Sequence, residues 1–187
     1  VEVIPHLYAR DGLDLARDLN GQFAFAVYDT KRDRLVLGRD QTGIAPLFWA
    51  RAGNGILFGS EIKALLVHPE IMRQLDLTGL DQILTYPGLV SPRTMFQGVQ
   101  ALRPGHLLVI EGGSPREVKY WDYDFPTAPV PGGVEEVALL DELDVALRGS
   151  VARRLVADVP VGVYVSGGLD SALIAAIAHQ IAPDLSL

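Results

Sequence analysis

The sequence predicts two domains of different class, an α+β domain built on antiparallel strands and then the start of an α/β domain. Three features predict this order. Residues 23–59 read as two consecutive hairpins, residues 120–133 are rich in proline and glycine, and residues 159–178 read as a buried strand, a glycine turn and a helix. We place the boundary inside the proline-rich segment, which gives domains of residues 1–128 and 129–187.

The composition fits a folded protein and excludes several functional classes. Of the 187 residues, 49% are hydrophobic, which is enough for a packed core, yet no apolar run is long enough to span a membrane. The net charge of -7 argues against a nucleic-acid binder, which needs a basic face. The absence of cysteine removes disulfides, thiolate metal sites and a cysteine nucleophile, and the four histidines lack metal-ligand spacing. No signal peptide is visible, so we expect a cytoplasmic protein.

The first half of the chain is expected to open with a helix and continue as hairpins. Apolar residues recur on one face over residues 1–10, as in a helix. Residues 21–29 alternate bulky and small side chains, which is typical of a strand, and residues 34–40 return as its partner. A second hairpin is expected around the glycine-containing turn at residues 51–55. We interpret the four strands as one antiparallel sheet.

Two short helices and a further strand are expected to complete the first domain. Residues 61–68 and 77–86 have the length and apolar spacing of short helices. A Pro-Gly turn then precedes an apolar strand at residues 106–110.

Beyond the proline-rich segment the periodicity changes. Leucine and valine recur every three or four residues over residues 140–155, which is typical of an amphipathic helix. Residues 159–166 form a continuous apolar run, which favours a strand of a parallel sheet buried on both faces. An alanine-rich run then indicates a helix. Strand, turn and helix in this order predict the start of an α/β unit.

The turn of sequence SGGLDS, residues 166–171, is the main functional candidate. Its glycines let a ligand approach the main chain, and the amides of the turn and of the first helical turn form a set of donors for an anion. Ser166 and Ser171 add hydroxyl donors. Asp170 would repel a bare anion but suits one that arrives with Mg²⁺. The turn therefore predicts a site for a magnesium-bound polyphosphate, and the alternative is a tight connection with Asp170 or Ser171 as the N-cap.

This turn, together with the segments before it, carries a resemblance to a known family. SGGLDS after an apolar strand resembles the pyrophosphate loop of the N-type ATP pyrophosphatases, which adenylate a carboxylate or a similar oxygen. Five upstream segments resemble, in order and at similar spacing, the glutaminase domain of glutamine-hydrolysing asparagine synthetases. They are LNGQFAFAVYD, LVLGRDQTGIAPLFWA, FGSEIKALLVHP, VSPRTMFQGVQALRPGHLLVI and YWDYDFP. The resemblance covers nearly the whole chain.

The resemblance implies the fold and activity of a longer enzyme. The fold would be the rear part of an N-terminal-nucleophile (Ntn) hydrolase-type α+β sandwich, followed by the start of an α/β parallel-sheet adenylating domain. The full enzyme would hydrolyse glutamine, convert aspartate and ATP to β-aspartyl-AMP and pyrophosphate, and use the ammonia to form asparagine. The family's glutaminase nucleophile is an N-terminal cysteine, which this chain lacks. We therefore interpret the chain as an internal fragment, inactive alone, and a homodimer of the full enzyme is a further expectation.

Motif and resemblance together assign the ATP and pyrophosphate contacts to one segment. The predicted contact residues are Tyr164, Val165, Ser166, Gly167, Gly168, Asp170 and Ser171. Tyr164 and Val165 would offer backbone groups to the nucleotide, and Asp170 would meet Mg²⁺ through the pyrophosphate. Two alternatives stay open: a ligase of the same family that amidates another carboxylate, and a non-catalytic glutaminase-like scaffold. The intact SGGLDS turn argues against the scaffold.

Two other carboxylates, Asp40 and Glu61, could form a catalytic pair, but a structural role is favoured for both. The pattern GRD..G..PLF predicts a bend at the end of a strand, with Arg39 and Asp40 hydrogen-bonded to the backbone. Ser60, Glu61 and Lys63 open a helix, where a cap and solvated charges explain them. The alternative, which the resemblance implies, is that this second region lines the family's ammonia path.

Overall fold

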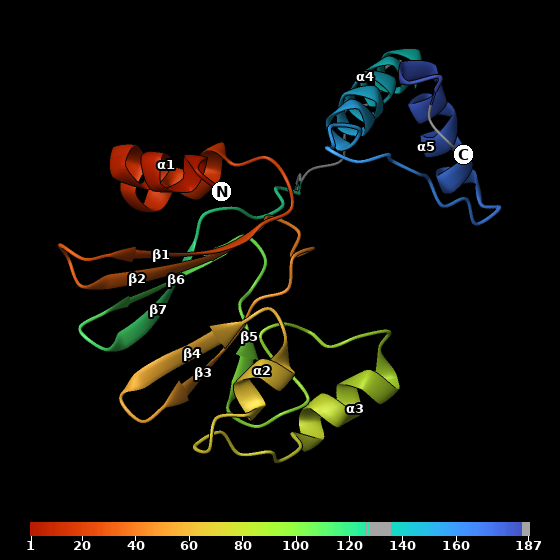
Figure 1. The fold of residues 1–187 in the computed structure, drawn as a ribbon. Coiled ribbons are helices and arrows are strands. Elements are labelled where there is room, and N and C mark those ends of the chain that lie inside the picture. The colour runs from red at the N-terminus through yellow and green to blue at the C-terminus, as the bar shows by residue number, and fades with distance from the viewer. Residues whose placement is uncertain (126, 128–135, 185–187) are drawn as a thin grey trace. The chain divides into compact units, whose positions relative to one another are not determined.

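The computed structural model describes residues 1–125, 127 and 136–184, and the chain divides into two compact units, Val1–Asp124 and Phe125–Leu187 (Figure 1). The expected boundary between residues 128 and 129 lies outside the described residues. The elements of the first unit are α1 (Val3–Asp11), the 3-10 helix η1 (Gly12–Asp18), β1 (Ala24–Asp29), β2 (Arg34–Arg39), β3 (Phe48–Ala52), β4 (Gly55–Gly59), α2 (Ile62–Leu66), α3 (Leu77–Thr85), β5 (Val99–Ala101), β6 (His106–Glu111) and β7 (Ser114–Lys119). The second unit has α4 (Glu136–Arg154) and α5 (Leu169–Ile181).

The strands of the first unit form two antiparallel sheets, which confirms the α+β class. One sheet has the order β1-β2-β6-β7 and the other the order β4-β3-β5. Both expected hairpins are present, but their union in one sheet is wrong. The free edge of β2 is taken by β6, which is distant in sequence, so β3 pairs instead with β4 and β5. Local patterns cannot reveal such long-range pairing.

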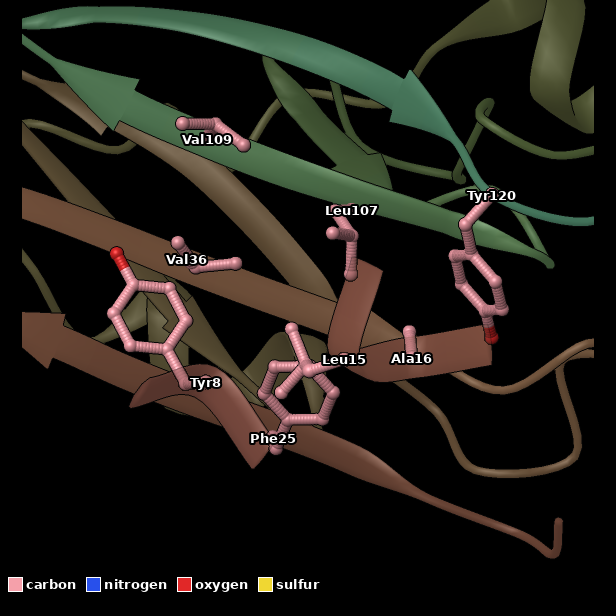
Figure 2. Packing of buried hydrophobic residues seen from close by; sticks show 8 residues of the cluster. All are labelled: Tyr8, Leu15, Ala16, Phe25, Val36, Leu107, Val109 and Tyr120. Carbon is pink, nitrogen blue, oxygen red and sulfur yellow. The ribbon is translucent and has the colours of Figure 1, made fainter. Parts of the chain in front are cut away.

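Helices α1 and η1 cover one face of the four-stranded sheet, as Figure 1 shows. The expected opening helix is therefore confirmed, and its apolar side contributes to the core. Figure 2 shows the buried cluster at this interface: Tyr8, Leu15, Ala16, Phe25, Val36, Leu107, Val109 and Tyr120. The bulky face of β1 lies on this cluster, with Phe25 buried and with Val27 and Phe23, which directly precedes the strand, packed against it.

The opposite face of the same sheet packs against the second sheet. Strands β2 and β6 alternate, with Val36 in the helix-facing cluster and Leu37 and Leu108 in a cluster shared with Trp49 of β3. The far face of β3 packs in turn against α2 through Leu65. The first unit is thus a sandwich of two sheets with helices on both outer faces, and it buries β2 and β6 on both sides.

The second unit confirms the two expected helices but not the strand between them. A small buried cluster, Val151, Ile177 and Ala178, joins α4 to α5. Residues 159–166 form no strand beyond a single bridge residue at Gly162, and most of their apolar side chains are exposed. A strand needs a neighbour along its length for its amide and carbonyl groups, and one bridge residue does not supply this. Over the described ranges, no helix combines the length and the apolar character needed to cross a membrane.

Gly105, in the turn before β6, lies in close contact with Trp121, which follows the end of β7. We therefore expect Gly105→Ala to be strongly destabilising. Its φ of 65° is left-handed, and an added Cβ would lie 2.4 Å from the Trp121 carbonyl oxygen. Gly112 is the matched control, since its φ is 59° but an added Cβ would meet nothing within 4 Å. In urea denaturation, Gly112→Ala should lower the unfolding free energy by about 1–2 kcal/mol from backbone strain. Gly105→Ala should lose roughly 1–3 kcal/mol more. Equal losses of unfolding free energy in the two variants would contradict the close approach of Gly105 to the Trp121 carbonyl.

Candidate functional site

The SGGLDS turn leads into α5, which begins at Leu169 within the motif, and the turn takes the shape that its glycines allow. Gly167 has a left-handed φ of 81°, which disfavours other residues, and a Cβ added there would meet nothing within 4 Å. Gly168 is the N-cap of α5, with extended backbone angles. Glycine is therefore required at 167 by conformation and not by crowding. The space beside its backbone is open to a ligand.

Hydrogen bonds of two serines, Ser166 and Ser171, fix the shape of the turn. The Ser171 hydroxyl oxygen lies 3.2 Å from the Ser166 amide nitrogen and 3.1 Å from the Ser166 hydroxyl, and it donates to the Gly168 carbonyl at 3.0 Å. The Gly168 amide in turn donates weakly to the Ser166 hydroxyl, at 3.4 Å. The sequence predicted these hydroxyls as ligand donors. In the structure they cross-link the turn.

The remaining polar groups of the turn face solvent. The amides of Gly167, Leu169 and Asp170 make no hydrogen bond within the described part of the chain, as expected for groups at or before a helix start. The Asp170 side chain is exposed in the first turn of α5. The turn therefore combines free amide donors, the positive end of a helix dipole and one carboxylate. This set suits an anion that carries a cation with it.

The seven predicted contacts lie in one continuous segment, as their adjacency in sequence requires. Tyr164 is fully exposed and Val165 half-exposed, in extended chain outside any strand. Both precede the turn, so their backbone groups are accessible beside it. Their assignment to a nucleotide stays a prediction.

An apolar hollow of about 460 Å³ lies within the second unit, and none of the residues 166–171 lines it. It is bordered by Val163 and Tyr164, which precede the turn, and by Val151, Ile174 and Ala178 of the two helices. Nothing in the sequence motif indicated it, because it forms between helices that are separated along the chain.

The carboxylate of Asp40 is fully occupied by backbone, which confirms its structural interpretation. Asp40 is 1% exposed, and its two oxygens accept from the Ile44 amide at 2.9 Å and the Ala45 amide at 2.8 Å. Burial alone would raise the pKa of Asp40, but these amides outweigh it and hold the pKa below its usual 3.8. A carboxylate in this setting is a loop brace and not an acid or base for a substrate.

Arg39 completes this brace from the other side. Its guanidinium donates to the carbonyls of Ala45 at 2.8 Å, Gly43 at 2.7 Å and Leu102 at 2.7 Å, and burial lowers its pKa. The Tyr120 hydroxyl donates to the Arg39 carbonyl at 2.7 Å. We call Arg39, Asp40 and the loop 40–45 the Arg39–Asp40 knot. The sequence predicted the backbone contacts of Arg39 and Asp40 but missed Tyr120.

The other charged candidates have surface roles. Glu61 is the N-cap of α2 and lies 2.6 Å from the Lys63 ammonium, with both side chains exposed. Such a pair contributes little to stability. The exposed charges support the structural interpretation of Glu61 and Lys63, but no side chain caps α2 by a hydrogen bond, so the expected side-chain cap is wrong. No group of three or more metal-ligating side chains occurs in the part of the chain that the structure describes.

Comparisons with known proteins agree with the order of the two units. The family model for the glutamine amidotransferase domain matches residues 1–121. The chain belongs to the glutamine amidotransferase family. The model for asparagine synthase matches residues 142–186, which include α5 and the SGGLDS turn. The resemblance to the glutamine-hydrolysing asparagine synthetases is thereby confirmed.

Individual proteins also match over nearly the whole chain. A glutamine-hydrolysing asparagine synthetase of Bacillus subtilis is 40% identical over 95% of this chain. The amidase chry2 of Gibberella zeae is 34% identical over 96%, and a putative glutamine-hydrolysing asparagine synthetase of Mycobacterium bovis is 34% identical over 95%. The chain spans 28%, 26% and 28% of their lengths, respectively.

The buried carboxylate of Asp40 should contribute to the acid sensitivity of the first unit's stability, and Asp40→Asn should remove that contribution. Because the folded pKa of Asp40 lies below its unfolded value, its contribution is complete above the unfolded pKa and is lost as pH falls through the folded pKa. At about pH 6, Asp40→Asn should lower the unfolding free energy by about 2–3 kcal/mol. Urea midpoints measured from about pH 6 to pH 2 should converge in acid. Parallel curves for the two proteins would contradict the prediction.

Proposed function

We propose that this chain is part of an ATP-dependent amide ligase of the glutamine-hydrolysing asparagine synthetase type. The observation that carries the proposal is the SGGLDS turn, with its open amides and exposed Asp170, within an asparagine synthase match that follows a glutamine amidotransferase match. Because the chain spans about a quarter of its relatives' length, activity is proposed for the longer protein.

The residues of the turn fit a magnesium-bound pyrophosphate by the chemistry of their donors. The amides of Gly167, Leu169 and Asp170 would bind the phosphate oxygens, and the α5 dipole would stabilise their charge. The Asp170 carboxylate would hold Mg²⁺, which neutralises the polyphosphate when bound. Ser166, Gly168 and Ser171 would fix the shape of the turn. Tyr164 and Val165 would contact the nucleotide through backbone groups.

The proposed reaction has two steps at this site. A carboxylate oxygen of aspartate attacks the α-phosphorus of ATP, the bond to the β-phosphate oxygen breaks, and pyrophosphate leaves. Ammonia nitrogen then attacks the acyl carbon of β-aspartyl-AMP, AMP leaves, and a proton is released to give asparagine. The ammonia would come from glutamine. The 187 residues contain no cysteine, so the group that cleaves glutamine is not assigned within this chain.

Several structural features support the finer details of this proposal. The sandwich of two antiparallel sheets supports an Ntn hydrolase-type first domain over residues 1–128. The apolar hollow and the exposed Val159 and Val165 support an adenylating domain over residues 129–187, because a parallel sheet covers such apolar surface on both faces. The homodimer and the cytoplasmic location stay predictions.

A second candidate is a related enzyme that acts on another carboxylate. The match to the amidase chry2 favours keeping it, since its name differs from that of the synthetases. Exchange of labelled pyrophosphate into ATP by the longer protein separates the possibilities. Exchange that needs aspartate supports asparagine formation, exchange that needs another carboxylate supports the second candidate, and no exchange with any carboxylate contradicts both.

Asp170→Asn in the longer protein should abolish adenylation but spare glutaminase activity. Asp170 is the one carboxylate in the turn, so its loss removes the Mg²⁺ contact without changing the shape of the side chain. Pyrophosphate exchange should fall at least about 100-fold, by analogy with the loss of one charge-stabilising group at a reacting centre. Glutamate release should be unchanged. Amide formation within twofold of wild type would rule out this role.

Gly167→Val should also abolish pyrophosphate exchange, for a conformational reason. A β-branched residue resists the φ of 81° and fills the open space beside the backbone. Gly88→Val is the control, because its φ is ordinary and an added Cβ there meets nothing within 4 Å. Normal exchange by a folded Gly167→Val protein would show that the turn is a simple connector.

A further inference from the structure

The segment that leaves the first unit is fixed at its start by the turn before β6. After β7 ends, the amides of Tyr120 and Trp121 both donate to the Gly105 carbonyl, at 2.9 and 3.2 Å. The Gly105 amide donates to the Asp40 carbonyl at 2.9 Å. Backbone hydrogen bonds therefore run from the exit segment through Gly105 into the Arg39–Asp40 knot.

The side chain of Tyr120 provides a second link between the segment after β7 and the Arg39–Asp40 knot. It is 7% exposed, and its ring lies in the cluster with Leu15, Ala16 and Leu107, as Figure 2 shows. Its hydroxyl donates to the Arg39 carbonyl at 2.7 Å. Burial and the nearby Asp40 charge both raise the pKa of Tyr120, so the phenol stays protonated and remains a donor.

These hydrogen bonds lead to the loop 40–45, whose shape depends on the side chains of Asp40 and Arg39. The loop 40–45 is held by the Asp40 carboxylate, which accepts the amides of Ile44 and Ala45, and by the Arg39 guanidinium, which donates to two loop carbonyls. Arg39 therefore contacts the loop through its side chain, and its own backbone carbonyl accepts the hydrogen bond from Tyr120. Movement of Arg39 would disturb both contacts together.

We propose that Tyr120 is a latch that couples the end of the first unit, residues 120–124, to the loop 40–45, so that displacing one loosens the other. Tyr120 lies only four residues before Asp124, where the first unit ends. A change in the direction of residues 120–124 reaches the loop through the Tyr120 hydroxyl and Gly105. The latch goes beyond the proposed function and does not depend on it.

Amide hydrogen exchange of the full 187-residue chain tests the latch with Tyr120→Phe, which removes only the hydroxyl. Exchange at Ile44 and Ala45 should rise about tenfold, as loss of one buried hydrogen bond predicts. The amides of Val36 and Val109, at the centre of the sheet, report global unfolding and serve as the reference. The rise at the loop must exceed any rise at these two positions.

Tyr8→Phe is the matched control. Tyr8 is also a buried member of the cluster, but its hydroxyl donates to Asp29 at 3.1 Å, away from the knot. This variant should leave exchange at Ile44 and Ala45 unchanged relative to the reference. An equal rise in both variants would overturn the latch, and so would an unchanged loop in Tyr120→Phe.

The reciprocal variant, Arg39→Lys, keeps the test decisive if Tyr120→Phe fails to fold. Lysine cannot reproduce the three-way guanidinium contacts, so the loop should loosen. If the coupling exists, exchange at the amides of Tyr120 and Trp121 should rise with it, by about tenfold. A rise confined to the loop, with the exit segment unchanged, would overturn the proposal.

Discussion

The burial of one carboxylate, that of Asp40, determines how the two sheets of the first unit are joined. A charged group removed from water must be surrounded by donors, and here the donors are amides of the loop that follows it. The loop can therefore adopt few other shapes. This loop carries the chain from β2 in one sheet to β3 in the other, so the sandwich and its shared core, with Leu37, Leu108 and Trp49, follow from it.

The sequence predicted the strands of this unit better than their partners. Local alternation identified β1 to β4 and β6, and the GRD pattern identified the backbone contacts of Asp40. The pairing of β2 with β6 joins Arg34 to Glu111, far apart in the chain, and no local pattern contains that information. Strand β7, with the sequence SPREVK, was missed because it is an edge strand with few apolar residues, and β5 has three residues.

At the candidate site, the sequence predicted what is local and missed what depends on neighbours. The glycines, Asp170 and the helix after them follow from the motif, because turn and helix form by short-range hydrogen bonds. The strand at 159–166 did not follow, since a strand is stabilised by a partner along its length and this segment has a single bridge residue, Gly162. The role of Ser171 also differs from the prediction: composition shows a hydroxyl but not which acceptor it meets.

Within the turn, hydrogen bonds of Ser166 and Ser171 compete with any bound anion for the serine hydroxyl protons. A hydroxyl has one proton, and the proton of Ser171 is already shared with the Gly168 carbonyl. An incoming oxyanion therefore meets backbone amides first and gains the hydroxyl only by exchanging one acceptor for another, with no net gain in hydrogen bonds. Selectivity at such a turn comes from the direction of main-chain N–H groups, which no substitution other than proline removes. The serines instead keep those groups aligned before a ligand arrives, which lowers the entropy lost on binding.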